Sequence, residues 1–192
     1  MTREDEVLGW LRTLDAERAR SAGVGMPCCT MVALWLLAMR DGVPAGVSTY
    51  QRAIDWGARV RLPHVAVHWW ARANVWPTIG SAWSALSAAE EITGGRYVAP
   101  VVVSASYRAP ELTPGRWHVI QRYRDPSLAF TQPEKAGGHT YLVRAGMASA
   151  DPVTVVQSSE GKRLRVSAGS WDGTAGLTGL HVGAVVLPAG TP

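Results

Sequence analysis

The feature that most constrains the fold is an apolar run at residues 26–40 (MPCCTMVALWLLAMR), which carries both cysteines of the chain at its start. Pro27 suits the first position of a helix, where its missing N–H removes no hydrogen bond. A helix that is apolar on every side has to be surrounded by other elements. The sequence therefore predicts a buried central helix that begins at Pro27 or Cys28 and ends at the glycine stop of Gly42.

A thiol in the first turn of a helix lies near unpaired N–H groups and the positive end of the helix dipole. Both favour the thiolate, so Cys28 and Cys29 are candidate nucleophiles. The alternative is that they are small buried hydrophobic residues, because free cysteine is among the most buried residue types. A nearby base decides between the two, and His139, in the downstream segment 137–143 (GGHTYLV), is the candidate.

The composition fits one globular domain over residues 1–192, with 47% hydrophobic and 18% charged residues. Two adjacent cysteines form no disulfide framework, and the spacing of a four-ligand zinc site is absent, so we expect a reducing compartment and neither metal nor cofactor. The N-terminus is acidic where a secretory signal would be basic, and no apolar run has membrane-spanning length. We therefore expect synthesis in the cytoplasm without a signal peptide or a membrane span.

The formal net charge is +4 and comes mostly from scattered arginines. No Lys/Arg cluster or interleaved aromatic pattern selects nucleic acid, so no nucleic-acid partner is expected. A basic surface also suits an anionic polymer such as the bacterial cell wall. Nine tryptophans against one phenylalanine suit either core filling or flat recognition of sugars and peptides.

The first half of the chain is predicted to be helical, over about residues 1–95. Thr2 and Asp5 form a capping pair for a helix of about residues 3–20, and a short helix follows at about 48–58. Residues 59–95 give mixed signals, with a strand near 60–67 and a helix near 80–91. His64 and His68 have the i, i+4 spacing of metal ligands, but Pro63 and the lack of a third ligand argue against a metal site.

The second half, about residues 96–190, consists of short β-rich runs bounded by turn residues. Strands are predicted over residues 97–106, 116–123, 140–145, 153–157, 162–168 and 180–187. These runs suggest an antiparallel meander. Helices followed by strands indicate an α+β domain.

Three short blocks of the β-rich half then occur in a familiar order. Residues 112–120 (LTPGRWHVI) resemble the "L-x-P-G-D-L-V" block of the papain-like thiol hydrolases of the NlpC/P60 and CHAP families. Residues 138–143 (GHTYLV) resemble their "G-H-V-a-i-v" strand, and residues 153–161 (VTVVQSSEG) the strand after it. The cysteine helix resembles their "C-S-G-F-V" or "C-T-W-Y-A" helix. The resemblance covers about half of the chain and leaves residues 43–110 as an enlarged insert.

The resemblance implies a papain-like domain in which a cysteine attacks an amide carbonyl, His139 is the base and Gln157 orients the imidazole. Either cysteine can be aligned, and the Cys-Thr pair favours Cys29. The implied substrate is bacterial peptidoglycan, as for phage lysins and interbacterial effectors, with an immunity or delivery partner possible. Action on the wall would follow delivery or lysis.

The signals for other candidate site residues are weaker. Trp69, Trp70 and Trp117 are candidates for substrate binding, and Trp76 and Trp83 for the same groove. His118 is interpreted as structural, and Asp151 and Asp172 are alternatives to Gln157.

The chain also departs from the family pattern, since Arg116 replaces the expected Asp and no Tyr precedes Tyr50. The substrate-binding half is therefore not defined by the resemblance. Two other functions stay open: a catalytically inactive binding or structural module, and a thiol acyltransferase or protease acting on a protein.

Overall fold

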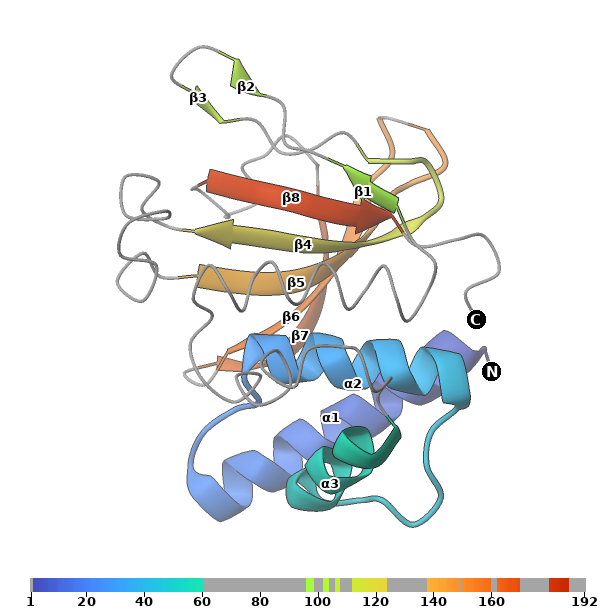
Figure 1. Ribbon diagram of the computed structural model, residues 1–192, viewed down its shortest axis with the longest axis vertical. Helices are drawn as coiled ribbons and strands as arrows, with labels where there is room; N and C mark the ends of the chain where they lie inside the picture. Colours follow the sequence, from blue (N-terminus) through green and yellow to red (C-terminus); the bar gives the residue numbers. More distant parts are fainter. Residues whose placement is uncertain are drawn as a thin grey trace.

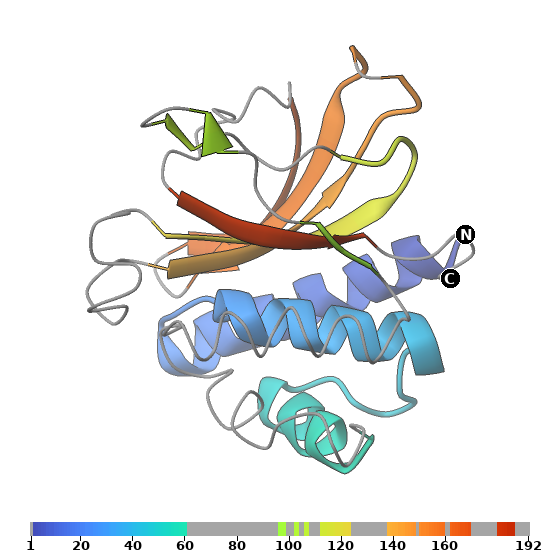
Figure 2. The ribbon, with the colours of Figure 1, turned by 45° about the horizontal axis from the view of Figure 1, so that its top comes forward.

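The structure is a computed structural model, and it describes residues 2–60, 96–98, 102–103, 106–107, 112–123, 138–148, 150–159, 162–169 and 180–186. Helices come first and strands second, so the predicted α+β class is confirmed (Figure 1). The helices α1 and α2 lie against one side of the sheet, and α3 packs on them from the side away from it (Figure 2). In the part of the chain described, no helix combines the length and the apolar character needed to cross a membrane.

The helices form close to where the sequence places them. They are α1 (Arg3–Ala22), α2 (Cys28–Asp41) and α3 (Tyr50–Val60). Thr2 and Asp5 form the predicted capping box, and Gly23 ends α1 with φ of 71°, in the left-handed region that glycine adopts without strain. Every residue of α2 from Cys28 to Met39 is buried, as predicted for a central helix.

The strands are β1 (Arg96–Val98), β2 (Val102–Val103), β3 (Ser106–Tyr107), β4 (Trp117–Tyr123), β5 (Gly138–Arg144), β6 (Val153–Ser159), β7 (Lys162–Gly169) and β8 (Leu180–Val186). Six of them form an antiparallel sheet in the order β1-β8-β4-β5-β6-β7.

The predicted meander is correct for β4 to β7 and wrong for the last strand. β8 returns to pair with the free edge of β4, because that edge still has unpaired backbone groups. The run predicted as one strand at 97–106 overlaps β1, which pairs with β8, and also the separate β2-β3 pair.

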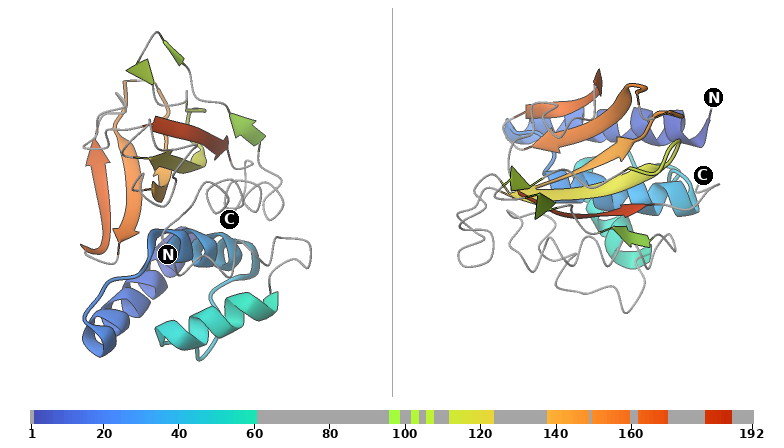
Figure 3. Two further views of the ribbon diagram at one scale, coloured as in Figure 1. Left: turned by 60° about the vertical axis from the view of Figure 1, so that its left-hand side comes forward. Right: turned by 90° about the horizontal axis from the view of Figure 1, so that it is seen from above.

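The sheet is apolar on both faces. On one face Trp117, Val119, Leu142 and Val156 pack against α1 and α2 in the main core. The opposite face carries a second cluster, which consists of Ile120, Tyr141, Val143, Val153 and Val155. A fully buried Leu or Met contributes about 1.5–3 kcal/mol, so the buried apolar residues of α2 stabilise this layer strongly. Figure 3 shows α1 and α2 on one side of the sheet.

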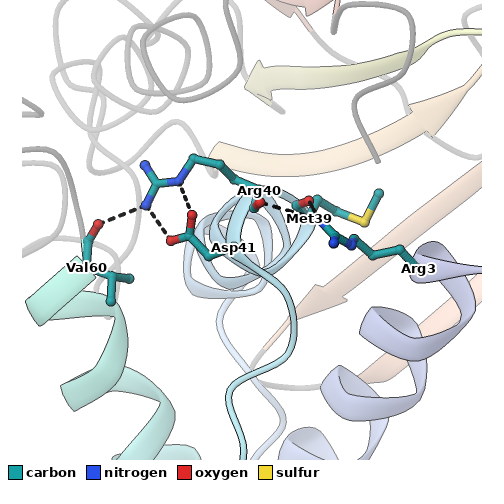
Figure 4. Close-up of polar contacts among 5 residues, drawn as sticks. All are labelled: Arg3, Met39, Arg40, Asp41 and Val60. Atoms are coloured by element: carbon teal, nitrogen blue, oxygen red, sulfur yellow. Dashed lines mark hydrogen bonds and ion pairs between the residues drawn. The ribbon is translucent and has the colours of Figure 1, made fainter.

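The C-terminal end of α2 is held by two arginines (Figure 4). Arg3 Nη1 donates to the carbonyl oxygens of Met39, at 3.1 Å, and Arg40, at 3.4 Å. Arg40 pairs with Asp41 through two bonds of 2.6 Å and also donates to the carbonyl of Val60, at 2.9 Å. These bonds satisfy carbonyls at the ends of α2 and α3 and link both α1 and α3 to α2.

The segment leading into α2 is held by a buried carboxylate. Asp15, on α1, is 1% exposed and accepts hydrogen bonds from the N–H of Met26 (2.8 Å), from Arg163 Nε (2.6 Å) and from the N–H of Leu164 (3.0 Å). One carboxylate therefore joins α1, the start of the cysteine helix and β7.

Gly25 fits the same junction tightly, because a Cβ there would lie 2.7 Å from the carbonyl oxygens of Ser159 and Lys162. Real Cβ atoms do not approach other atoms this closely, so only glycine fits without a shift of the β6-β7 hairpin.

Candidate active site

The candidate nucleophiles occupy the first two positions of α2. The helix begins at Cys28, and Pro27 caps it without a side-chain hydrogen bond, so the N–H groups of the first turn are left without a capping side chain. Cys28 is 7% exposed and Cys29 is 1% exposed. Neither forms a disulfide.

Strand β5 places the candidate base beside Cys28. His139 is half-buried near the start of the strand, and its imidazole is near enough to the Cys28 thiol to lower the pKa of that thiol. The imidazole stacks on Tyr141, with ring centroids 5.5 Å apart and planes at 21°. More than a hundred residues of chain separate Cys28 from His139, so the contact is made by the packing of α2 on the sheet.

Strand β6 brings Gln157 to the other side of the imidazole. Nε2 of His139 lies 3.1 Å from the side-chain amide of Gln157, which accepts a hydrogen bond when its Oε1 faces the ring. With Nε2 engaged by Gln157, Nδ1 is the ring nitrogen left for Cys28. Cys28, His139 and Gln157, three of the four residues that the resemblance selected, are therefore brought together.

The electrostatics separate the two cysteines. The pKa of Cys28 lies well below its ordinary value because its sulfur accepts hydrogen bonds from the Cys29 thiol, from His139 and from the backbone N–H of Thr140, and these outweigh burial. Donation to Cys28, together with burial, raises the pKa of Cys29 well above its ordinary value. The sulfur of Cys29 also lies 3.5 Å from the hydroxyl of Thr140.

This geometry favours Cys28 as the nucleophile, in contrast to the preference for Cys29 that the Cys-Thr match suggested. Both thiols lie against β5, but they have different neighbours there. Cys28 lies beside His139 and is 7% exposed, whereas Cys29 lies beside the hydroxyl of Thr140 and is 1% exposed.

Trp117 does not fit its predicted role in substrate binding. Its side chain is buried in the main core, 5.2 Å from the ring of Trp35, and its indole N–H donates to Glu4 at 2.9 Å. The prediction is wrong because Trp117 faces the helices, on the face of β4 opposite to that of Ile120. Trp69, Trp70, Trp76 and Trp83 lie outside the described residues, as do His64, His68 and Asp172.

His118 is a structural residue, as the sequence suggested. It is fully buried, its Nε2 accepts the N–H of Thr113 (3.0 Å) and its Nδ1 donates to the carbonyl of Arg116 (3.1 Å). Burial lowers the pKa of His118 to about 4. Asp151 is exposed and accepts the N–H of Ala148 within its own turn, so it does not orient His139.

Sequence reasoning missed two residues near this site, Asp15 and Arg165. Asp15 carries no motif signal, because a single acidic residue in an amphipathic helix is usually exposed. Arg165 could have been found, because pairing the predicted strands 153–157 and 162–168 as a hairpin brings it opposite Gln157.

No group of three His, Cys, Asp or Glu side chains suited to a metal ion occurs among the described residues. Comparisons of the chain with family models, with curated proteins and with solved structures found no match.

Proposed function

We propose that this chain is a cysteine hydrolase with a papain-like fold that cleaves an amide bond, with bacterial peptidoglycan as the substrate. The observation that carries the proposal is the arrangement of Cys28, His139 and Gln157, contributed by the first turn of a buried helix and by two adjacent strands. The choice of substrate rests on the resemblance of three sequence blocks to the NlpC/P60 and CHAP families.

The proposed reaction begins with attack of the Cys28 thiolate on the carbonyl carbon of the amide. The negative charge that develops on the carbonyl oxygen would be stabilised by N–H groups in the first turn of α2, which Pro27 leaves without a capping side chain. His139, protonated, gives its proton to the leaving amine, which breaks the C–N bond and leaves a thioester on Cys28. Water, deprotonated by His139, then hydrolyses the thioester.

Gln157 supports this cycle by orienting the ring. With its Oε1 accepting from the Nε2–H of His139, it keeps Nδ1 directed at Cys28 in both the neutral and the protonated ring. Cys29 supports it by donating a hydrogen bond to the thiolate.

A second candidate function is a binding module that keeps the fold without the reaction. The observation that favours it is the low exposure of Cys28, 7%, which is small for a nucleophile that must meet a polymer. An acyltransferase would form the same thioester and pass the acyl group to an acceptor other than water. A protease would form it on a polypeptide in place of peptidoglycan.

The test uses the full chain on purified cell walls, with release of soluble fragments as the readout. We expect Cys28→Ala and His139→Ala to abolish release, while Cys29→Ser, which keeps a hydrogen-bond donor beside Cys28, retains most of it. Far-ultraviolet circular dichroism of each variant controls for folding.

Release that is unchanged in Cys28→Ala would overturn the proposal. If iodoacetamide labels Cys28 of the wild type rapidly at pH 6 but the wild type does not cleave cell walls, the reactive thiol is supported and the substrate is another acyl compound. Neither labelling nor cleavage would favour the binding module.

A further inference from the structure

Three polar side chains stand in a row across neighbouring strands. His139 lies on β5, Gln157 on β6 and Arg165 on β7, and Gln157 and Arg165 are directly paired in the register of the β6-β7 hairpin. Gln157 is 8% exposed, whereas Arg165 is exposed. The buried amide thus lies between the imidazole and a guanidinium that reaches solvent.

The hydrogen bonds of Arg165 determine how the Gln157 amide points. With Oε1 turned to Arg165, it accepts from Nε at 3.2 Å and from Nη2 at 3.0 Å, and the NH₂ group donates to Nε2 of His139 at 3.1 Å. The reverse orientation sets the NH₂ group against the guanidinium, where donors face donors. Bonds from a charged donor are about twice as strong as neutral ones, so the first orientation is preferred while Arg165 is in place.

This orientation puts His139 in the wrong form for catalysis. When Nε2 accepts a hydrogen bond from Gln157, the ring is neutral and its single proton is on Nδ1. With Nε2 engaged by Gln157, Nδ1 is the nitrogen left for Cys28, and it can donate to the thiolate. The ring cannot take a second proton on Nε2 while the NH₂ group of Gln157 faces that nitrogen, so it cannot form the imidazolium that gives a proton to the leaving amine. Both working forms of the ring, neutral and protonated, carry a proton on Nε2 and need Oε1 of Gln157 as its acceptor.

We propose that Arg165 holds the site in a resting form by competing with His139 for the carbonyl oxygen of Gln157, and that a carboxylate of the substrate releases it by pairing with Arg165. The inference rests on the proposed function and adds to it an anionic group on the substrate. Within the described residues no acidic side chain pairs with Arg165, and its planar, exposed fork matches a carboxylate through two parallel hydrogen bonds. The amide of Gln157 can then turn, and no covalent bond changes. Arg165 is a positioning residue, since it acts on His139 through Gln157.

The direct test is nitrogen-15 NMR of the histidine ring in the full chain, with the His139 signals assigned from a His139→Gln variant. The wild type is expected to show the neutral ring with its proton on Nδ1. Arg165→Met should move the proton to Nε2, and Arg165→Lys, which keeps a charged donor, should stay close to the wild type. Lys162→Met removes the same charge from the exposed start of β7 and should change nothing.

A second measurement follows alkylation of Cys28 by iodoacetamide between pH 5 and 8. Since loss of a hydrogen bond to a charged group changes an equilibrium by about tenfold or more, Arg165→Met should raise the rate at pH 6 by about tenfold. N-acetylalanine should increase the rate of Cys28 alkylation in the wild type and leave the rate in Arg165→Met unchanged. N-acetylalaninamide, which lacks the carboxylate, should increase the rate in neither protein.

A wild-type ring that already carries its proton on Nε2, or an Arg165→Met profile that matches the wild type, would overturn the resting form. Equal effects of the acid and the amide would overturn release by a carboxylate. Both failures differ from a failure of the proposed function, which is read from the cell-wall activity of Cys28→Ala and His139→Ala and not from the position of the proton on the His139 ring.

Discussion

Replacing Asp15 by alanine should weaken both the fold and the start of the cysteine helix. Both carboxylate oxygens are in use: Oδ1 accepts the N–H of Met26, and Oδ2 accepts Arg163 Nε and the N–H of Leu164. Alanine leaves these donors without their partner at a position that is 1% exposed. Asparagine supplies only one carbonyl oxygen, so it should recover part of the loss at most.

The magnitude follows from the burial of the donors. An unsatisfied buried N–H costs about 1–3 kcal/mol, and the N–H groups of Met26 and Leu164 are buried and partly buried. The side chain of Arg163 is 57% exposed, so its ion pair is screened by water and adds little. We therefore expect Asp15→Ala to reduce the free energy of unfolding by about 2–4 kcal/mol.

The measurement is urea unfolding followed by tryptophan fluorescence, with Asp55→Ala as the matched control. Asp55 is exposed on α3 and accepts a hydrogen bond from Gln51 of the same helix, so its loss should cost less than about 0.5 kcal/mol. Because Met26 lies two residues before Cys28, Asp15→Ala should also slow iodoacetamide labelling of Cys28 under native conditions. A cost below about 1 kcal/mol, or one equal to that of Asp55→Ala, would refute the reasoning.

Two further predictions concern single residues of the fold. His118 has a folded-state pKa of about 4 against 6.5 when unfolded, so the unfolded chain binds more protons and stability should fall by about 1.4 kcal/mol per pH unit from pH 6.5 down to about pH 4. The difference in unfolding free energy between wild type and His118→Gln, measured across this range, should show that slope, and a flat difference would contradict it. Gly25→Ala should destabilise the chain because its Cβ meets the carbonyl oxygens of Ser159 and Lys162, whereas Gly9→Ala, with nothing within 4 Å, should stabilise α1 by about 0.5–1 kcal/mol. Thermal unfolding of the two variants checks the contrast, and a stable Gly25→Ala would refute it.

The sequence predicts the local elements of this chain well, because their signals are local. The capping pair of Thr2 and Asp5, the apolar run of α2 and the β-rich run of β6 each depend on neighbours within a few residues. The position of β8 depends on which sheet edge is free after the meander closes, and no local pattern encodes that. The predicted role of Trp117 in substrate binding is wrong for a similar reason. The residue type suggests a binding surface, but the face of the sheet on which Trp117 lies is in the core, and this face depends on the tertiary packing.

For the candidate site, the sequence could not predict which group donates and which accepts in each hydrogen bond. The motif order selects Cys28, Cys29, His139 and Gln157, but the direction of each hydrogen bond depends on residues outside the motifs. Cys28 is distinguished from Cys29 by its neighbours. Hydrogen bonds from Cys29 and His139 lower the pKa of Cys28, whereas donation to Cys28 raises the pKa of Cys29.

The orienting amide of Gln157 changes from acceptor to donor when the guanidinium of Arg165 takes its oxygen. A residue of the right type at the right distance from a histidine can therefore hold it in either protonation form. Strand β7, which carries Arg165, and not the motif itself, therefore decides whether the contact between Gln157 and His139 supports catalysis or prevents it.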